Sequence, residues 1–139
     1  MNKNDLELPM EDVTLQGDLQ VPVDAQGLVL FAHGSGSGRK SARNRAVAEV
    51  LQAQGIGTLL FDLLTRREDE AEDLRFDIPL LSARLTGVAD LVQRDARLRH
   101  LPIGLFGAST GAASALNTAA ARPHLIKAVV SRGGRPDLA

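Results

Sequence analysis

Short apolar runs alternate with stretches of helical periodicity along most of the chain. Runs of strand length occur at 27–32, 57–63, 102–106 and 127–130. Continuous apolar runs are typical of strands that are covered on both faces, as in a parallel sheet. Strand–helix–strand alternation implies right-handed crossovers that place helices on both faces of such a sheet. We therefore expect an α/β three-layer sandwich with a mostly parallel sheet, in a single domain over residues 1–139.

Three helices are expected between these strands. The first spans 40–54, with Gly55 at the position of a left-handed C-terminal cap. The second begins at Asp77, an N-cap followed by Pro79 in the first turn, and runs to about Leu98. The third is alanine-rich and runs from 109 to 121. The residues expected on the buried faces are Ala46, Val47, Val50 and Leu51 in the first helix and Leu81, Leu85, Val88 and Val92 in the second.

Two segments fall outside this alternation. Residues 11–23 alternate apolar and polar positions around Gly17, which predicts a small antiparallel hairpin with its turn at that glycine. Residues 66–77 are dense in charge, and we interpret them as a solvated loop. The hairpin would add an antiparallel part at the N-terminal side of the sheet.

The amino-acid composition excludes several kinds of binding partner and of chemistry. The net charge is −1, so there is no basic field to hold nucleic acid or an anionic membrane. The chain has no cysteine, which excludes disulfides, thiolate catalysis and cysteine-based metal sites, and we expect neither a metal nor a cofactor. The polar first residues lead into no apolar signal region, and the longest apolar runs are too short to span a bilayer. We expect a cytoplasmic protein.

The strongest chemical signal follows the strand at 102–106. Gly107-Ala108-Ser109-Thr110-Gly111 reads G-x-S-x-G between a buried strand and a helix. A strand that turns directly into a helix holds the middle residue in a strained conformation, and small neighbours let the chain pass. The serine oxygen is then held outward at the positive end of the helix dipole. We interpret Ser109 as a nucleophile; the alternative is a serine that only caps the helix.

A glycine-rich loop follows the strand at 27–32. His33-Gly34-Ser35-Gly36-Ser37-Gly38 stands where a hydrolase of this architecture takes its second oxyanion donor. The donors would be the main-chain N–H groups of Ser35 and Thr110, and His33 would anchor the loop through hydrogen bonds. A phosphate cradle is a rival interpretation, although Arg39 stands where the P-loop pattern needs a glycine before Lys40. A plain flexible loop is a third.

These residues resemble the α/β-hydrolase superfamily, most closely its dienelactone hydrolase-like branch. The similarity rests on the segments 30–36, 59–64 and 107–111, and it implies hydrolysis of an ester or related acyl bond through an acyl-serine, with no cofactor. It assigns Ser109 as the nucleophile, Ser35 and Thr110 as oxyanion donors, and Asp62 as a structural strand-end residue. The glycines Gly34, Gly107 and Gly111 support the site. Dienelactone hydrolases proper carry cysteine at this elbow, so lactone specificity is not transferred.

The triad of this superfamily runs serine, acid, histidine along the chain. After Ser109 come only His124 and then Asp137, in the wrong order, and His124 and His100 are expected far from the serine. Hence we expect a C-terminally incomplete hydrolase domain, the nucleophile-bearing portion, with little or no turnover of its small-molecule acyl substrate. A non-catalytic binding domain on the same scaffold and a nucleotide-binding α/β domain are the alternatives. The last strand, 127–130, would be a bare edge that favours self-association.

Overall fold

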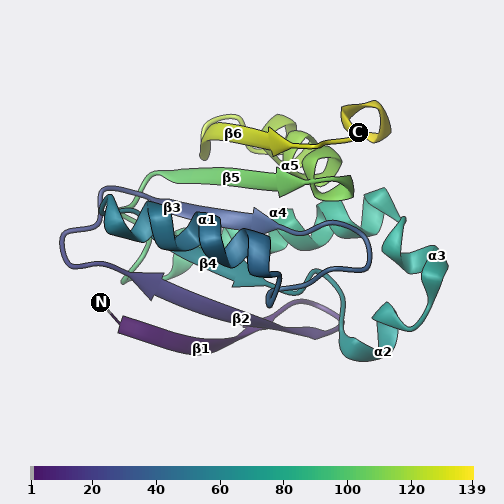
Figure 1. Ribbon diagram of the computed structural model, residues 1–139, viewed down its shortest axis with the longest axis horizontal. Coiled ribbons are helices and arrows are strands. Elements are labelled where there is room, and N and C mark those ends of the chain that lie inside the picture. Colours follow the sequence, from purple (N-terminus) through teal and green to yellow (C-terminus); the bar gives the residue numbers. More distant parts are fainter. Residues whose placement is uncertain (1) are drawn as a thin grey trace.

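A mixed six-stranded sheet with helices on both faces forms the protein (Figure 1). The computed structural model describes residues 2–139. The strands lie in the order β1-β2-β4-β3-β5-β6. Their bounds are β1 Asn2–Pro9, β2 Thr14–Val21, β3 Leu28–Ala32, β4 Gly57–Phe61, β5 Ile103–Ala108 and β6 Ile126–Arg132. The helices are α1 Ala42–Ala53, α2 Arg66–Asp69, α3 Glu72–Arg75, α4 Ile78–Arg94 and α5 Thr110–Ala121, and a short 3-10 helix, η1, spans Pro136–Leu138.

The sheet is parallel over four neighbouring strands. β4, β3, β5 and β6 run in one direction, whereas β1 and β2 form an antiparallel hairpin that joins the sheet by antiparallel pairing of β2 with β4. This architecture confirms the predicted α/β fold class with its N-terminal antiparallel part. The carboxyl ends of the four parallel strands meet at one edge, where α/β sheets bind their ligands.

Each face of the sheet carries its own core. Along β3, Leu28, Leu30 and Ala32 face the larger core, which α4 and α5 cover, while Phe31 faces a smaller core under α1. Figure 1 shows α1 on one side of the sheet and α4 and α5 on the other. The helix stripe Leu81, Leu85, Val88 and Val92 is buried as predicted. The helix itself ends at Arg94, and Leu98 is buried in the turn that follows.

The predicted turn at Gly17 is wrong. Gly17 lies inside β2, which continues unbroken from Thr14 to Val21, and the hairpin partner is β1. The side chains around it are tightly packed, since a Cβ atom there would lie 3.1 Å from Leu8 and 3.3 Å from Leu59 and Phe61. The glycine therefore marks close packing of side chains on a strand rather than a reversal of the chain.

The predicted buried face of α1 is confirmed only in part: Val47 and Leu51 pack against the smaller core, whereas Ala46 and Val50 are exposed. Val50 is 64% exposed, and the buried row is Asn44, Ala48 and Gln52, spaced four residues apart. Gln52 Nε2 donates to the hydroxyl of Thr58 on β4, 2.8 Å away. Buried amides must find partners, and Gln52 finds one in the sheet. The predicted left-handed cap at Gly55 is confirmed, with φ +82°.

The charge-dense segment 66–77 is not an open loop. It forms the short helices α2 and α3, and Thr65 begins α2 with a reciprocal capping box in which Thr65 and Glu68 satisfy each other's main-chain N–H groups. The predicted N-cap at Asp77 is confirmed, since its carboxylate accepts from the N–H of Leu80. Among the described residues, no helix combines the length and the apolar character that a bilayer crossing requires.

Candidate active site

Ser109 forms a sharp turn between β5 and α5. Its dihedral angles are φ +56° and ψ −122°, a conformation that few residues other than glycine adopt. The side chain is exposed, and its hydroxyl makes no capping hydrogen bond to α5. The alternative that this serine only caps the helix is therefore wrong. A residue that keeps such strain at the carboxyl edge of a parallel sheet is a candidate functional residue.

Two glycines make this turn sterically feasible. A Cβ atom at Gly107 would lie 2.6 Å from the Cα of Ala112, inside the start of α5. A Cβ at Gly111 would lie 2.7 Å from the carbonyl oxygen of His33 and closer still to that of Ala32. The N-terminus of α5 thus packs directly against the main chain at the end of β3. This close approach brings the turn at Ser109 beside the glycine-rich loop.

The end of β6 and the loop that follows it hold the main chain of Ser109 on both sides. The N–H of Ser109 donates to the carbonyl oxygen of Arg132, and the carbonyl oxygen of Ser109 accepts from the N–H of Arg135, both at 3.2 Å. A Cβ at Gly134 would lie 2.6 Å from the Cβ of Ala112, so this loop also packs on α5. This contact was not predicted from the sequence. The pair Gly133-Gly134 directly after a strand at the ligand-binding edge was the available signal.

The side chain of Arg132 crosses the sheet edge to α1. Its guanidinium lies 5.4 Å from the ring centroid of Phe106 and donates to Oδ1 of the buried Asn44, 2.9 Å away. The cation over the ring and the hydrogen bond fix the guanidinium from two directions. Arg132 thus links β6, β5 and α1 at the position where it supports the backbone of Ser109.

The predicted oxyanion residues lie next to each other. The N–H of Ser35 donates to Oγ1 of Thr110 at 2.9 Å, and Thr110 is buried. A Cβ atom at Gly34 would lie 2.9 Å from the Cβ of Ser109. The glycine-rich loop and the serine turn are therefore in contact, and the N–H of Ser35 is bound to a hydroxyl in this state.

His33 makes one hydrogen bond with each ring nitrogen. Nε2 accepts from the N–H of Leu63 at 2.9 Å, which leaves Nδ1 to donate to the carbonyl oxygen of Gly34, also at 2.9 Å. Burial lowers the pKa of His33, against the hydrogen bond to Gly34, which favours the charged form. The ring is thus a neutral imidazole with a fixed tautomer that ties the loop after β3 to the end of β4.

The other histidines lie at the opposite edge of the sheet. His100 precedes β5 and His124 precedes β6, so both lie where the parallel strands begin, and both are exposed. Asp137 lies in η1, and its carboxylate pairs with Arg135 at 3.0 Å, which lowers the pKa of the acid. Among the described residues, His33 is the only histidine at the edge that carries Ser109, and both of its nitrogens are engaged.

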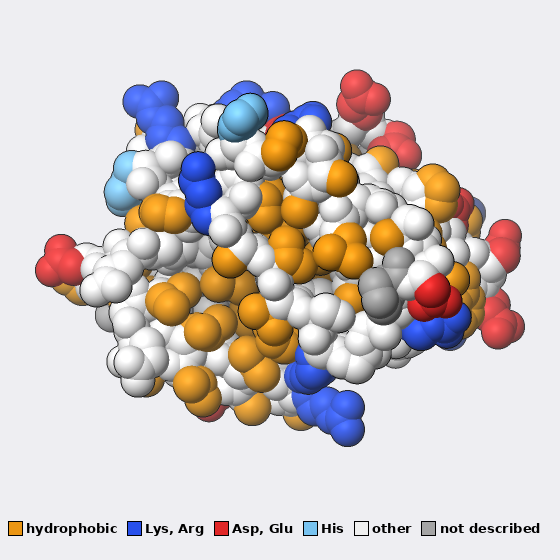
Figure 2. All heavy atoms as spheres, turned by 90° about the horizontal axis from the view of Figure 1, so that it is seen from above, with side chains coloured by type: hydrophobic (Ala, Val, Ile, Leu, Met, Phe, Trp, Pro, Cys, Tyr) orange, Lys and Arg blue, Asp and Glu red, His pale blue; other side chains and the backbone are white. Residues whose placement is uncertain are grey.

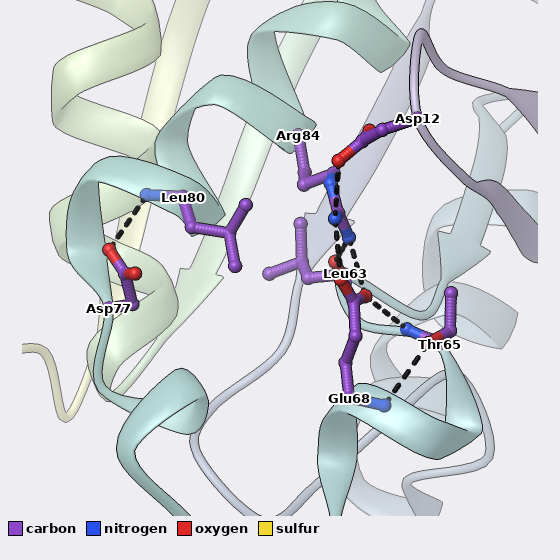
Figure 3. A network of polar contacts seen from close by, with 7 residues as sticks. All are labelled: Asp12, Leu63, Thr65, Glu68, Asp77, Leu80 and Arg84. Atoms are coloured by element: carbon purple, nitrogen blue, oxygen red, sulfur yellow. Dashed lines mark hydrogen bonds and ion pairs between the residues drawn. The ribbon is translucent and has the colours of Figure 1, made fainter. Parts of the chain in front are cut away.

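A buried ion pair fixes α2 beside this edge (Figure 3). The guanidinium of Arg84, 4% exposed, donates to both carboxylate oxygens of Glu68 at 2.9 and 2.7 Å and to the carbonyl oxygen of Leu63. Asp12, from the β1–β2 turn, lies 3.5 Å away. The hydrogen bonds from Arg84 lower the pKa of Glu68 from an ordinary 4.5 to about 2. The pair attaches α2 to α4 and to the end of β4.

Two adjoining hollows open at this edge. The small one touches Ser35, Gly34 and Thr110, and the large one, about 910 Å³, lies between the glycine-rich loop, the end of β4 and α2. The two share a rim that consists of His33, Gly36, Leu64 and Asp69. Asp62, at the end of β4, accepts from the main-chain N–H and the guanidinium of Arg39 and so holds the loop. Among the described residues, no group of acids and histidines is arranged to hold a metal ion.

The sheet and its helices form an α/β fold that matches those of α/β-hydrolases. The structure of dienelactone hydrolase from Anabaena variabilis is similar with a TM-score of 0.95 and 52% identity, over 99% of this chain and 65% of that one. Est1E from Butyrivibrio proteoclasticus (TM-score 0.75, 20% identity, 90% of this chain and 48% of that one) and an esterase from Pyrococcus furiosus (0.77, 21%, 96% and 49%) share the fold.

Curated relatives carry a different name. Proteins from two strains of Mycobacterium tuberculosis, named provisionally as phosphoribosyl transferases, are 55% identical to this chain over 128 residues. The match covers 91% of this chain and 29% of each relative. The chain thus spans less than a third of the relatives that bear this name. No protein-family model matches the sequence.

Proposed function

We propose that this chain carries the nucleophile of a serine hydrolase that acts on ester or related acyl bonds. The single observation that supports the proposal best is the conformation of Ser109, strained at φ +56° with an exposed side chain at the N-terminus of α5. The hydroxyl oxygen attacks the acyl carbon and the carbonyl π electrons move to the oxygen. As the carbonyl re-forms, the bond to the leaving group breaks, the acyl-serine remains, and the proton lost by the hydroxyl ends on the leaving group by way of solvent. The similarity to a dienelactone hydrolase at 52% identity supports the same chemistry.

The oxyanion is stabilised by the main-chain N–H groups of Ser35 and Thr110. In the unliganded state the N–H of Ser35 donates to Oγ1 of Thr110, so a substrate oxygen replaces that hydroxyl as the acceptor. The rigid packing of Gly111 against Ala32 and His33 supports this role, because preorganised donors need no rearrangement of the main chain. Removing one such donor typically costs about 3 kcal/mol of transition-state stabilisation.

Among the residues that the structure describes, no histidine is free to act as a general base for Ser109. His33 is neutral, but its Nε2 accepts from Leu63 and its Nδ1 donates to Gly34, so neither nitrogen is free to take the serine proton. Without a base, a triad enzyme keeps only the part of its rate that the oxyanion hole and binding supply. We therefore propose that the isolated chain is acylated slowly and turns over little or not at all.

Covalent modification of Ser109 by a serine-directed phosphonylating reagent tests the proposal directly. The purified chain is incubated with a fluorophosphonate and followed by intact-mass spectrometry, with peptide mapping of the adduct. We expect slow, stoichiometric modification at Ser109, none in Ser109→Ala, and normal modification in Ser131→Ala, which removes an exposed serine near the end of β6 at the same edge. Equal labelling of the chain and of Ser109→Ala would contradict the nucleophile. Stable binding of small molecules without labelling would favour a non-catalytic domain on this scaffold.

A further inference from the structure

The large hollow beside the serine turn contains cationic side chains that the acyl chemistry does not use. Its volume is about 910 Å³, in the range of small-molecule sites, and Ser109 is not among its lining residues. It is lined by the glycine-rich loop from Gly36 to Ser41, the end of β4, the start of α2 and the start of β2. The glycine-rich loop therefore faces two hollows, one at the oxyanion residues and this one.

The charges of the lining do not cancel. Arg39 is occupied by Asp62, to which it donates from its main chain and its side chain, and Asp69 pairs with Arg75 at 3.2 Å. In the part of the chain that the structure describes, no carboxylate lies within 4 Å of the Lys40 ammonium or the Arg66 guanidinium. Two exposed cations thus line a hollow in which each carboxylate already has an arginine partner.

The rest of the lining is rich in hydrogen-bonding groups and poor in flat apolar ones. Thr14, Gln16 and Ser37 have exposed polar side chains, and Asp62 and Asp69 supply further acceptor oxygens. No phenylalanine is among the described lining residues, and the chain has neither tyrosine nor tryptophan, so there is no surface on which a nucleobase would stack. Hydroxyl groups of a ligand fit such a lining, whereas an aromatic base does not.

We propose that this hollow binds a phosphorylated, hydroxyl-rich small molecule of the sugar phosphate class, with its phosphate held by Lys40 and Arg66. A phosphate monoester carries close to two negative charges at neutral pH, which matches two unpaired cations, whereas a carboxylate carries one. Lysine binds phosphate as a point charge, and arginine binds it through its fork of N–H donors. The hydroxyls then contact Thr14, Gln16 and Ser37. The site stands whether or not Ser109 is a nucleophile.

Three hexoses separate the contributions of the phosphate, of a single negative charge and of the hydroxyl groups to binding. They are glucose 6-phosphate, glucuronate and glucose, which share a ring and differ in the group at C6. Binding is followed by amide chemical shifts of the loop 36–41 in two-dimensional NMR, at ligand concentrations up to about 5 mM, where even weak sites fill. We expect saturable shifts with glucose 6-phosphate, weaker binding of glucuronate, and none of glucose. Equal affinity for glucuronate, or no shift of the loop by glucose 6-phosphate, would overturn the proposal.

Charge-removing variants locate the phosphate. Lys40→Gln/Arg66→Gln should weaken glucose 6-phosphate binding at least about tenfold, because both charge-assisted contacts are lost. The matched control is Arg43→Gln/Arg67→Gln, which removes two exposed cations that are close to Lys40 and Arg66 in the sequence but outside the lining, and it should leave affinity within about twofold. Equal losses in the two double variants would mean attraction by overall charge only and would overturn the site. Repeating the titration in Ser109→Ala keeps this result separate from the outcome of the labelling experiment.

Discussion

The main-chain N–H of Ser109 donates to the carbonyl oxygen of Arg132, 3.2 Å away, so the strained serine is held by the strand that follows it in the sheet. Arg132 is in turn fixed by its side chain, which contacts Phe106 and the amide of Asn44. Strain of this kind persists only where the surroundings over-determine it. The loop after β6 is therefore part of the serine turn, although it lies more than twenty residues further along the sequence.

We expect Asn44→Ala to weaken this support. The variant removes the amide oxygen that accepts from the Arg132 guanidinium, and the loss of a buried hydrogen bond to a charged group costs about 1–3 kcal/mol. The free energy of unfolding in urea should fall by that amount, and fluorophosphonate labelling of Ser109 should slow because the carbonyl of Arg132 is less firmly placed. Arg43→Ala, an exposed neighbour on the same helix, serves as the control. Unchanged stability would argue against the Arg132–Asn44 contact in solution.

Replacement of Gly111 by alanine should be far more damaging than replacement of Gly104. A Cβ at Gly111 would overlap the main chain of Ala32 and His33, which cannot move away as a flexible side chain can. At Gly104 the nearest atoms are 3.6 and 3.8 Å away, which is ordinary contact. We expect Gly111→Ala to lose at least about 3 kcal/mol of stability or to fail to fold, and Gly104→Ala to change it by less than about 1 kcal/mol. Thermal melts of the two variants measure this difference, and equal melting temperatures would contradict the prediction.

The serine turn could be predicted from the sequence because the motif that marks it, G-x-S-x-G, lies within five consecutive residues, Gly107 to Gly111. The fold class followed from the alternation of strand-length and helical segments. The role of Arg132 could not be predicted in this way, since its partner Asn44 is 88 residues away and is brought close only by the pairing of β6 with β5. The turn predicted at Gly17 was wrong for a different reason. The alternation through Leu15, Gly17 and Leu19 is unbroken, and a single strand was the better interpretation.

The Glu68–Arg84 pair should make stability depend on acid pH. The pKa of Glu68 falls from 4.5 to about 2 in the folded chain, so its contribution is fully present above pH 4.5 and is lost as the pH falls towards 2. With 21% of the Glu68 side chain exposed, the contribution is on the order of 2–3 kcal/mol. Urea midpoints measured from pH 6 to pH 2 should drop steeply in the parent chain.

The same titration in Glu68→Gln should show a shallower loss over that pH window, because the titrating group is gone. Glu70→Gln removes an exposed acid from the same segment, for which no such contact exists among the described residues, and should follow the parent curve. Parallel curves for the parent chain and Glu68→Gln would show that other carboxylates carry the pH dependence.

The outer edge of β6 predicts self-association. In the part of the chain that the structure describes, β6 lies at the edge of the sheet and pairs with β5 alone, so its other edge has no strand partner there. Val130 is 53% exposed on this strand and Leu116 on α5 is 37% exposed. Figure 2 views the molecule from the side of β6 and shows hydrophobic side chains gathered over this face. Exposed edges and apolar patches of this kind promote association.

We therefore expect sedimentation velocity to show dimers or larger species whose fraction rises with protein concentration. Val130→Lys should shift the distribution towards monomer, because a charge on an edge strand opposes pairing with another edge. Val50→Lys replaces a valine that is also exposed, but on α1 and away from the sheet edge, and should leave the distribution unchanged. A parent chain that remains monomeric at all concentrations, or equal effects of the two substitutions, would show that the β6 edge does not drive association.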